Sequence, residues 1–175
     1  MNIPSTFQTV IEHFKKNGWI FQLAAGQPVL TANFRGKNGN FRLVVFVDEA
    51  DNLFQVFGFL SLIAPAHKQA AITELCVRLS FAMKMGRFEV DPNDGEIRFQ
   101  TYSAFPPGQL TDDVVRRVVG VNLLMVDQNF PAFAAVIYAN QSPEEAATQT
   151  RARIASGQPT GPEPQLQMPA RLTLN

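Results

Sequence analysis

Cysteine and histidine are scarce in this chain, which has one cysteine, Cys76, and two histidines, His13 and His67, among its 175 residues. A single cysteine cannot form an intrachain disulfide, and it suits a reducing compartment. One cysteine and two scattered histidines also fall short of the ligand sets that zinc sites use. We therefore expect no disulfide framework and no metal site.

The chain has no excess charge of either sign, because 15 basic residues balance 15 acidic residues. Proteins that bind nucleic acid or anionic lipid usually concentrate positive charge, so we expect no nucleic-acid partner. Long apolar runs are also missing, since the best stretch, 114–126, is interrupted by Arg116 and Arg117. The N-terminus shows no basic segment followed by an apolar block. We therefore expect no membrane span, no signal peptide and a cytoplasmic location.

Hydrophobic residues are plentiful, at 46% of the chain, and 15 residues are phenylalanine. A domain of about 150 residues buries roughly 70% of the surface that its unfolded chain exposes, so this supply can form a proper core. We expect one domain over 1–140 and a short C-terminal helix over 141–155. The segment 156–175 is rich in proline and lacks aromatic residues, which predicts a flexible tail.

Apolar spacing predicts four helices. The first covers about 5–17, with Ser5 as its N-cap, and the second begins after Pro65. Thr111 can cap a long third helix, which we expect to kink or restart at Pro131 because proline lacks the amide donor. Ser142 with Pro143 marks the start of the last helix.

Alternating patterns predict six strands, with boundaries near 19–24, 29–35, 41–47, 53–63 and two more within 86–103. Asn38-Gly39 lies between two of them and predicts a hairpin with a type I′ turn, in which both central residues need positive φ. The fold class expected is therefore α+β, an antiparallel sheet of about five or six strands flanked by helices.

The strand at 53–63 is apolar on both faces. A strand of this kind is usually covered on both faces, either by helices of its own chain or by a second copy of the protein. Sequence alone does not decide between these two. We expect partner or dimer contact through four apolar residues of this strand, Phe57, Phe59, Leu60 and Leu62.

The stretch 91-DPNDGE-96 is rich in acidic residues, as calcium-binding loops are. An EF-hand loop that began at Asp91 would need an acid at position 5, where Gly95 stands, and a glutamate at position 12, where Tyr102 stands. Proline, asparagine, aspartate and glycine in this order are typical of a plain turn between strands. The turn is the preferred interpretation, and calcium binding through Asp91, Asp94 and Glu96 is the alternative.

No catalytic set is recognisable. His67 and Cys76 are nine residues apart on one predicted helix, so at about 100° per residue they lie on opposite faces. The glycine-containing segment 36-GKNGN-40 lacks the spacing of a phosphate-binding loop and precedes a strand. We therefore expect no enzyme activity and no cofactor.

The string 84-KMGRFEVDPNDGEIRFQ-100, together with 17-NGWIF-21, resembles the YbjN family over about 5–140. The motifs that carry the likeness are Gly86-Arg87-Phe88-Glu89, Asp91 and Asp94-Gly95-Glu96-Ile97. Members are described as candidate bacterial sensory-transduction regulators, with a related group in cyanobacteria. The resemblance implies a fold like that of type III secretion chaperones, whose members are typically homodimers that bind a polypeptide. It supplies no catalytic residues.

The function expected is a non-enzymatic, homodimeric protein-binding module, chaperone-like or regulatory, with an unidentified polypeptide partner. The alternative is a small-ligand-binding or enzymatic domain with its site between the sheet and the helices. A deep pocket with convergent polar groups would favour that alternative.

Overall fold

The computed structural model describes residues 4–81 and 83–156, and the expected α+β architecture is confirmed. Six strands form one antiparallel sheet: β1 (Gln22–Leu23), β2 (Val29–Arg35), β3 (Asn40–Asp48), β4 (Leu53–Ile63), β5 (Arg87–Val90) and β6 (Glu96–Ala104). The helices are α1 (Ser5–Lys16), the 3₁₀ turn η1 (Ala66–Lys68), α2 (Gln69–Phe81), α3 (Asp112–Tyr138) and α4 (Pro143–Ala155). The tail predicted at 156–175 lies, apart from Ser156, outside the described residues.

The strand order in the sheet is β1-β2-β3-β4-β6-β5, with every neighbouring pair antiparallel. The central strand β4 pairs with β3 on one side and with β6 on the other. Strand β1 pairs with β2 over only two residues. The strand predicted at 19–24 is therefore much shorter than expected.

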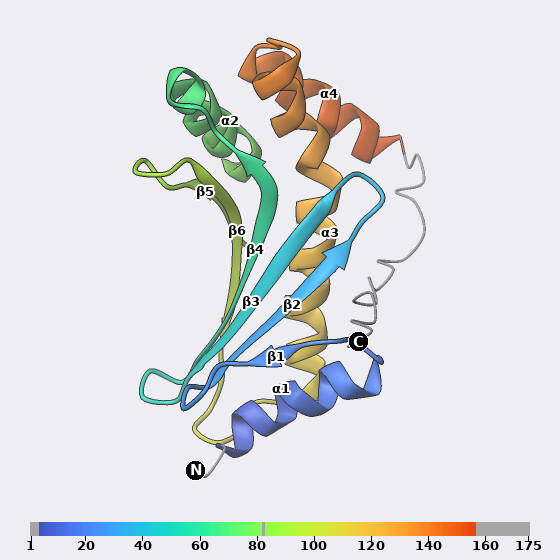
Figure 1. Ribbon diagram of the computed structural model, residues 1–175. Coiled ribbons are helices and arrows are strands. Elements are labelled where there is room, and N and C mark those ends of the chain that lie inside the picture. The colour runs from blue at the N-terminus through green and yellow to red at the C-terminus, as the bar shows by residue number, and fades with distance from the viewer. Residues whose placement is uncertain (1–3, 82, 157–175) are drawn as a thin grey trace, which may run out of the picture.

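One face of the sheet packs on helices, and the other does not. Figure 1 shows α3 running along one side of the twisted sheet, with α1 across its lower end and α2 and α4 at the upper end. Residues of β4 alternate between buried and partly exposed along the whole strand. Among the described residues, no helix covers the second face. Of the two alternatives for covering β4, helices of the same chain therefore do not account for its second face.

The contact between the sheet and α3 contains a buried polar group. The Asn122 amide nitrogen donates to Val56 O at 3.0 Å, to Phe99 O at 2.9 Å and to Thr101 Oγ1 at 3.1 Å. Gly58 makes room for this side chain, because a Cβ at Gly58 would lie 2.2 Å from Asn122 Oδ1. This asparagine therefore ties the middle of α3 to both β4 and β6.

The hairpin between β2 and β3 forms where Asn38-Gly39 predicts it, but the turn type is wrong. Neither residue has a positive φ, and the connection has four residues, 36–39. The hairpin tip packs on α3, where Asn38 N donates to Asp127 Oδ1 at 2.8 Å. A Cβ at Gly39 would lie 2.4 Å from the ring of Phe130. Glycine is therefore needed here for close approach to the helix.

Of the two outcomes expected at Pro131, the start of a new helix does not occur, since α3 is continuous through this residue. A proline inside a helix leaves the carbonyl four residues earlier without its amide donor, and that carbonyl belongs to Asp127. The side-chain amide of Asn38 donates to Asp127 O at 3.0 Å and replaces the missing bond. The helix therefore continues with a donor supplied by the hairpin.

The helix ends agree only in part with their predicted caps. Thr111 caps α3, and Ser142 with Glu145 forms a complete capping box at α4. Ser5 is inside α1, whose N-cap is Pro4 without a side-chain hydrogen bond. That predicted cap is wrong, because Ser5 itself already has helical geometry.

By length and composition alone, α3 passes the test for a membrane-spanning helix, with a mean hydropathy of 1.2 in its best 18-residue window. Half of that window is buried inside the domain. A helix that packs a sheet along its length must be this apolar, so the helix is explained by its place in the core.

Candidate functional site

The uncovered face of the sheet, which we call the open face, combines aromatic rings with charged side chains. One row across it runs Arg42, Phe59, Arg98 and Glu89, and each residue is the direct cross-strand partner of the next. The neighbouring row contains Phe57. Because successive side chains of a strand point to opposite faces, these residues all point away from α3.

Arginines lie over both phenylalanines of β4 that belong to the open face. The guanidinium carbon of Arg42 is 4.7 Å from the ring centre of Phe59, and that of Arg98 is 5.0 Å from the ring centre of Phe57. Such contacts combine cation–π attraction with packing of the aliphatic stem on the ring. Both rings are therefore half-buried although no helix covers them.

Carboxylates hold these arginines in place. Arg42 Nη2 donates to Glu96 Oε1 at 3.0 Å, and Glu89 accepts from Arg98 Nε at 2.8 Å and from Arg87 Nε at 2.6 Å. Partial burial acts to raise the pKa of Glu89, but the hydrogen bonds and charges of Arg98 and Arg87 outweigh it, so that pKa is lowered. Glu89 therefore stays ionised between its two arginines at neutral pH.

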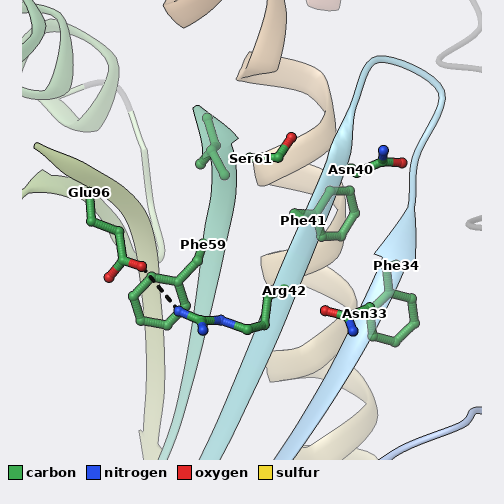
Figure 2. A pocket seen from close by; sticks show the side chains of 9 residues that line it. Asn33, Phe34, Asn40, Phe41, Arg42, Phe59, Ser61 and Glu96 are labelled. Carbon is green, nitrogen blue, oxygen red and sulfur yellow. Dashed lines mark hydrogen bonds and ion pairs between the residues drawn. The ribbon is translucent and has the colours of Figure 1, made fainter. Parts of the chain in front are cut away.

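Beside Phe59 the open face is hollowed, with a volume of about 310 Å³ (Figure 2). The residues that line this hollow and belong to the open face are Asn33, Asn40, Arg42, Phe59, Ser61 and Glu96. The structure shows no hydrogen bond within the described chain for the side chains of Asn33, Asn40 and Ser61. They offer amide and hydroxyl groups beside an aromatic ring, which suits recognition of a polypeptide.

The four residues expected to form a contact surface do not share a face. Phe57 and Phe59 lie on the open face, whereas Leu60 and Leu62 are only 4% and 6% exposed and belong to the core. The strand alternation explains this division. Leu60 and Leu62 are therefore not available to a partner in this conformation, and the candidate surface keeps the two phenylalanines.

The pairing of arginines with rings and glutamates on the open face was missed by sequence reasoning, which considered Glu96 only as an alternative calcium ligand. Alternation within 86–103 does place Glu89 and Arg98 on the face of their strands that is opposite to the face with the apolar residues. Arg42 faces Phe59 across the β3–β4 hairpin, whereas the register that brings Arg98 over a ring of β4 is set by pairing between the distant segments β4 and β6. This second register is not fixed by a hairpin turn between neighbouring strands.

The acidic stretch forms the plain turn between β5 and β6. Gly95 has a φ of +76°, and Asp91 and Asp94 accept hydrogen bonds from the backbone amides of Asn93 and Glu96. Over residues 4–81 and 83–156, no group of three or more histidine, cysteine, aspartate or glutamate side chains is placed to hold a metal ion.

Cys76 and His13 both occupy positions with a structural role. Burial raises the pKa of the Cys76 thiol to about 12, with a further contribution from Glu89, so the thiolate is scarce at neutral pH. The His13 ring nitrogen Nδ1 lies 2.6 Å from Asp112 Oδ1 and links α1 to the first turn of α3. The hydrogen bond from His13 lowers the pKa of Asp112.

Comparison with known proteins gives one family. The model for YbjN, described as "Putative bacterial sensory transduction regulator", matches residues 6–135. A solved structure, "Crystal structure of YbjN, a putative transcription regulator from E. coli", has a TM-score of 0.50 and 10% sequence identity. That match covers 69% of this chain and 90% of the other, and at this identity it supports the fold alone. Among proteins whose functions have been curated, none matches the sequence. Because the family model covers most of the chain, this protein belongs to the YbjN family.

Proposed function

We propose that this protein is a non-enzymatic regulatory module that acts as a homodimer and binds a polypeptide partner through its open face. The observation that carries the proposal is a central strand, β4, whose two outward phenylalanines have no helix over them. The family description names a regulator and no reaction, which agrees with a binding role.

The chemistry of the open face suits a reversible contact with a partner. Arg42 and Arg98 are about half exposed, so the energy that holds each side chain over its ring is small. A partner that brings its own carboxylates can pair with these arginines as they move off the rings. The exposed rings of Phe57 and Phe59 then become the apolar centre of the interface, surrounded by polar groups.

The experiment compares the wild type with the Phe57→Ser/Phe59→Ser variant. Sedimentation equilibrium gives the oligomeric state, and affinity capture with mass spectrometry gives bound proteins. We expect a dimeric wild type that captures one protein at near-equal ratio, and a monomeric variant that captures none. The control is Leu124→Ser, which removes an exposed apolar side chain of α3 and should behave as the wild type.

Thermal unfolding checks that each variant is folded, because the substituted side chains lie outside the core. A wild type that is monomeric and captures nothing would contradict the proposal. So would a folded double variant that dimerises and captures like the wild type.

A further inference from the structure

A second hollow lies between α2, α3 and α4, and it shares no residue with the open face. It has a volume of about 450 Å³, within the usual range of small-molecule sites. Its larger apolar lining residues are Leu79, Met83, Met85, Val121, Met125 and Ile154. We call it the methionine groove. Because it lies among helices, it differs from the site between sheet and helices that the sequence suggested as an alternative.

The apolar side chains that line the methionine groove are aliphatic or thioether, and no aromatic ring is among the described lining residues. Methionine side chains are flexible and polarisable, so they adapt to an irregular apolar guest. A flat aromatic ligand would find no ring to stack on. The lining therefore favours an alkyl chain.

Polar groups inside the groove are few. Asn129 is buried, and its amide nitrogen already donates to Met125 O at 2.8 Å. Thr150 is the other buried polar residue among those that line the groove. An extended peptide would lose hydration at each backbone amide and find almost no replacement partners. An alkyl chain carries no such cost.

The charged residues of the groove are of one sign. Lys84 and Arg151 line it and are exposed, and the described residues that line it include no aspartate or glutamate. Within residues 4–81 and 83–156, the Arg151 guanidinium donates to two neutral acceptors, Arg78 O at 3.3 Å and Thr148 Oγ1 at 3.5 Å. Two cations beside an apolar groove complement an anionic head group on an apolar tail.

We propose that the methionine groove binds a free, single-chain aliphatic carboxylate. The alkyl chain lies among the methionines, and the carboxylate pairs with Lys84 and Arg151. This site goes beyond the proposed function. Since the two surfaces share no residue, loss of one leaves the other to be tested separately.

The test is calorimetric titration of the full chain with octanoate, nonanoate and decanoate, each below its micelle concentration. Each added methylene that becomes buried should tighten binding about fourfold. Decanol, which has the same chain without the charge, should bind on the order of tenfold more weakly than decanoate.

The charge assignment is tested with the Lys84→Gln/Arg151→Gln variant. We expect it to bind decanoate on the order of tenfold more weakly and decanol unchanged, a split that misfolding would not produce. The matched control is Lys15→Gln/Arg117→Gln, which removes two exposed cations elsewhere and should bind decanoate as the wild type does.

Three results would overturn this proposal. They are the absence of saturable decanoate binding, an affinity that does not depend on chain length, and a Lys84→Gln/Arg151→Gln variant that binds decanoate as tightly as the wild type. Co-sedimentation with vesicles of anionic phospholipid, without binding of monomeric decanoate, would assign the surface to a bilayer and would also overturn it.

Discussion

Strand β4 is apolar on both faces, yet the two faces are covered in different ways. On the inner face, Phe54 and Leu60 are buried in the core on the side of the sheet that α3 covers. On the open face, Phe57 and Phe59 lie under the side chains of two arginines. An apolar pattern in a sequence thus reports that a residue is shielded from water, and it does not report what shields it.

The sharpest test of this comparison replaces one phenylalanine on each face of β4 with alanine. Phe54→Ala should lower the free energy of unfolding by about 3–5 kcal/mol, because it leaves a cavity in the core. Phe57→Ala, three positions away, should cost about 1 kcal/mol, since its ring is shielded only by a half-exposed arginine side chain. Urea unfolding measures both. Equal losses would mean that the open face is covered as firmly as the inner face.

A second test concerns what holds the inner face to its helix. Asn38→Ala removes the donor to the Asp127 carbonyl and should destabilise the protein by about 1–2 kcal/mol. In a Pro131→Ala background the alanine amide can donate to that carbonyl, so the same substitution should cost less. Urea unfolding of the four proteins gives the coupling energy. Asn40→Ala, at the same hairpin, is the control, and strictly additive effects would contradict the assignment.

The smallest effect expected is on the open face and depends on pH. The folded-state pKa of Glu89 is lowered, so its contribution is complete above the unfolded value of about 4.3 and is lost as pH falls through the folded value. The wild type should exceed Glu89→Gln in stability by about 1 kcal/mol or less at pH 7. This difference should shrink below about pH 4.

Thermal melting between pH 3 and 7 measures the difference. Glu12→Gln on α1 removes one negative charge without touching the open face, and it shows how much of the pH dependence comes from net charge alone. A stability difference for Glu89→Gln that stays constant with pH would contradict the role given to the Arg87 and Arg98 pairs.

Features with local causes could be predicted from the sequence. The boundaries of β2 and β4, the turn at Gly95 and the capping box of α4 all follow from residues close together in the chain. Features set by distant residues could not be predicted. Pro131 stays helical because the side chain of Asn38 binds the carbonyl of Asp127, which is 89 residues away in the chain, and Phe57 is shielded by Arg98 of β6.

The candidate site was predictable to the same extent. Sequence alternation separates Phe57 and Phe59 from Leu60 and Leu62, but it does not say which of the two faces a helix covers. That choice depends on the crossing of α3 over β4 and β6, which Asn122 and Gly58 fix by close contact. Both residues look unremarkable in the sequence because their roles exist only after the helix has docked.

The bond between Asn38 and the Asp127 carbonyl also bears on the order in which the chain folds. Before the hairpin arrives, α3 has an unfilled acceptor one turn before Pro131, so its second half is the weaker half. That second half carries Phe133, whose ring lies 5.0 Å from that of Phe88 on β5. We therefore expect the β2–β3 hairpin to form early, and the far edge of the sheet to assemble only after the hairpin has completed the helix.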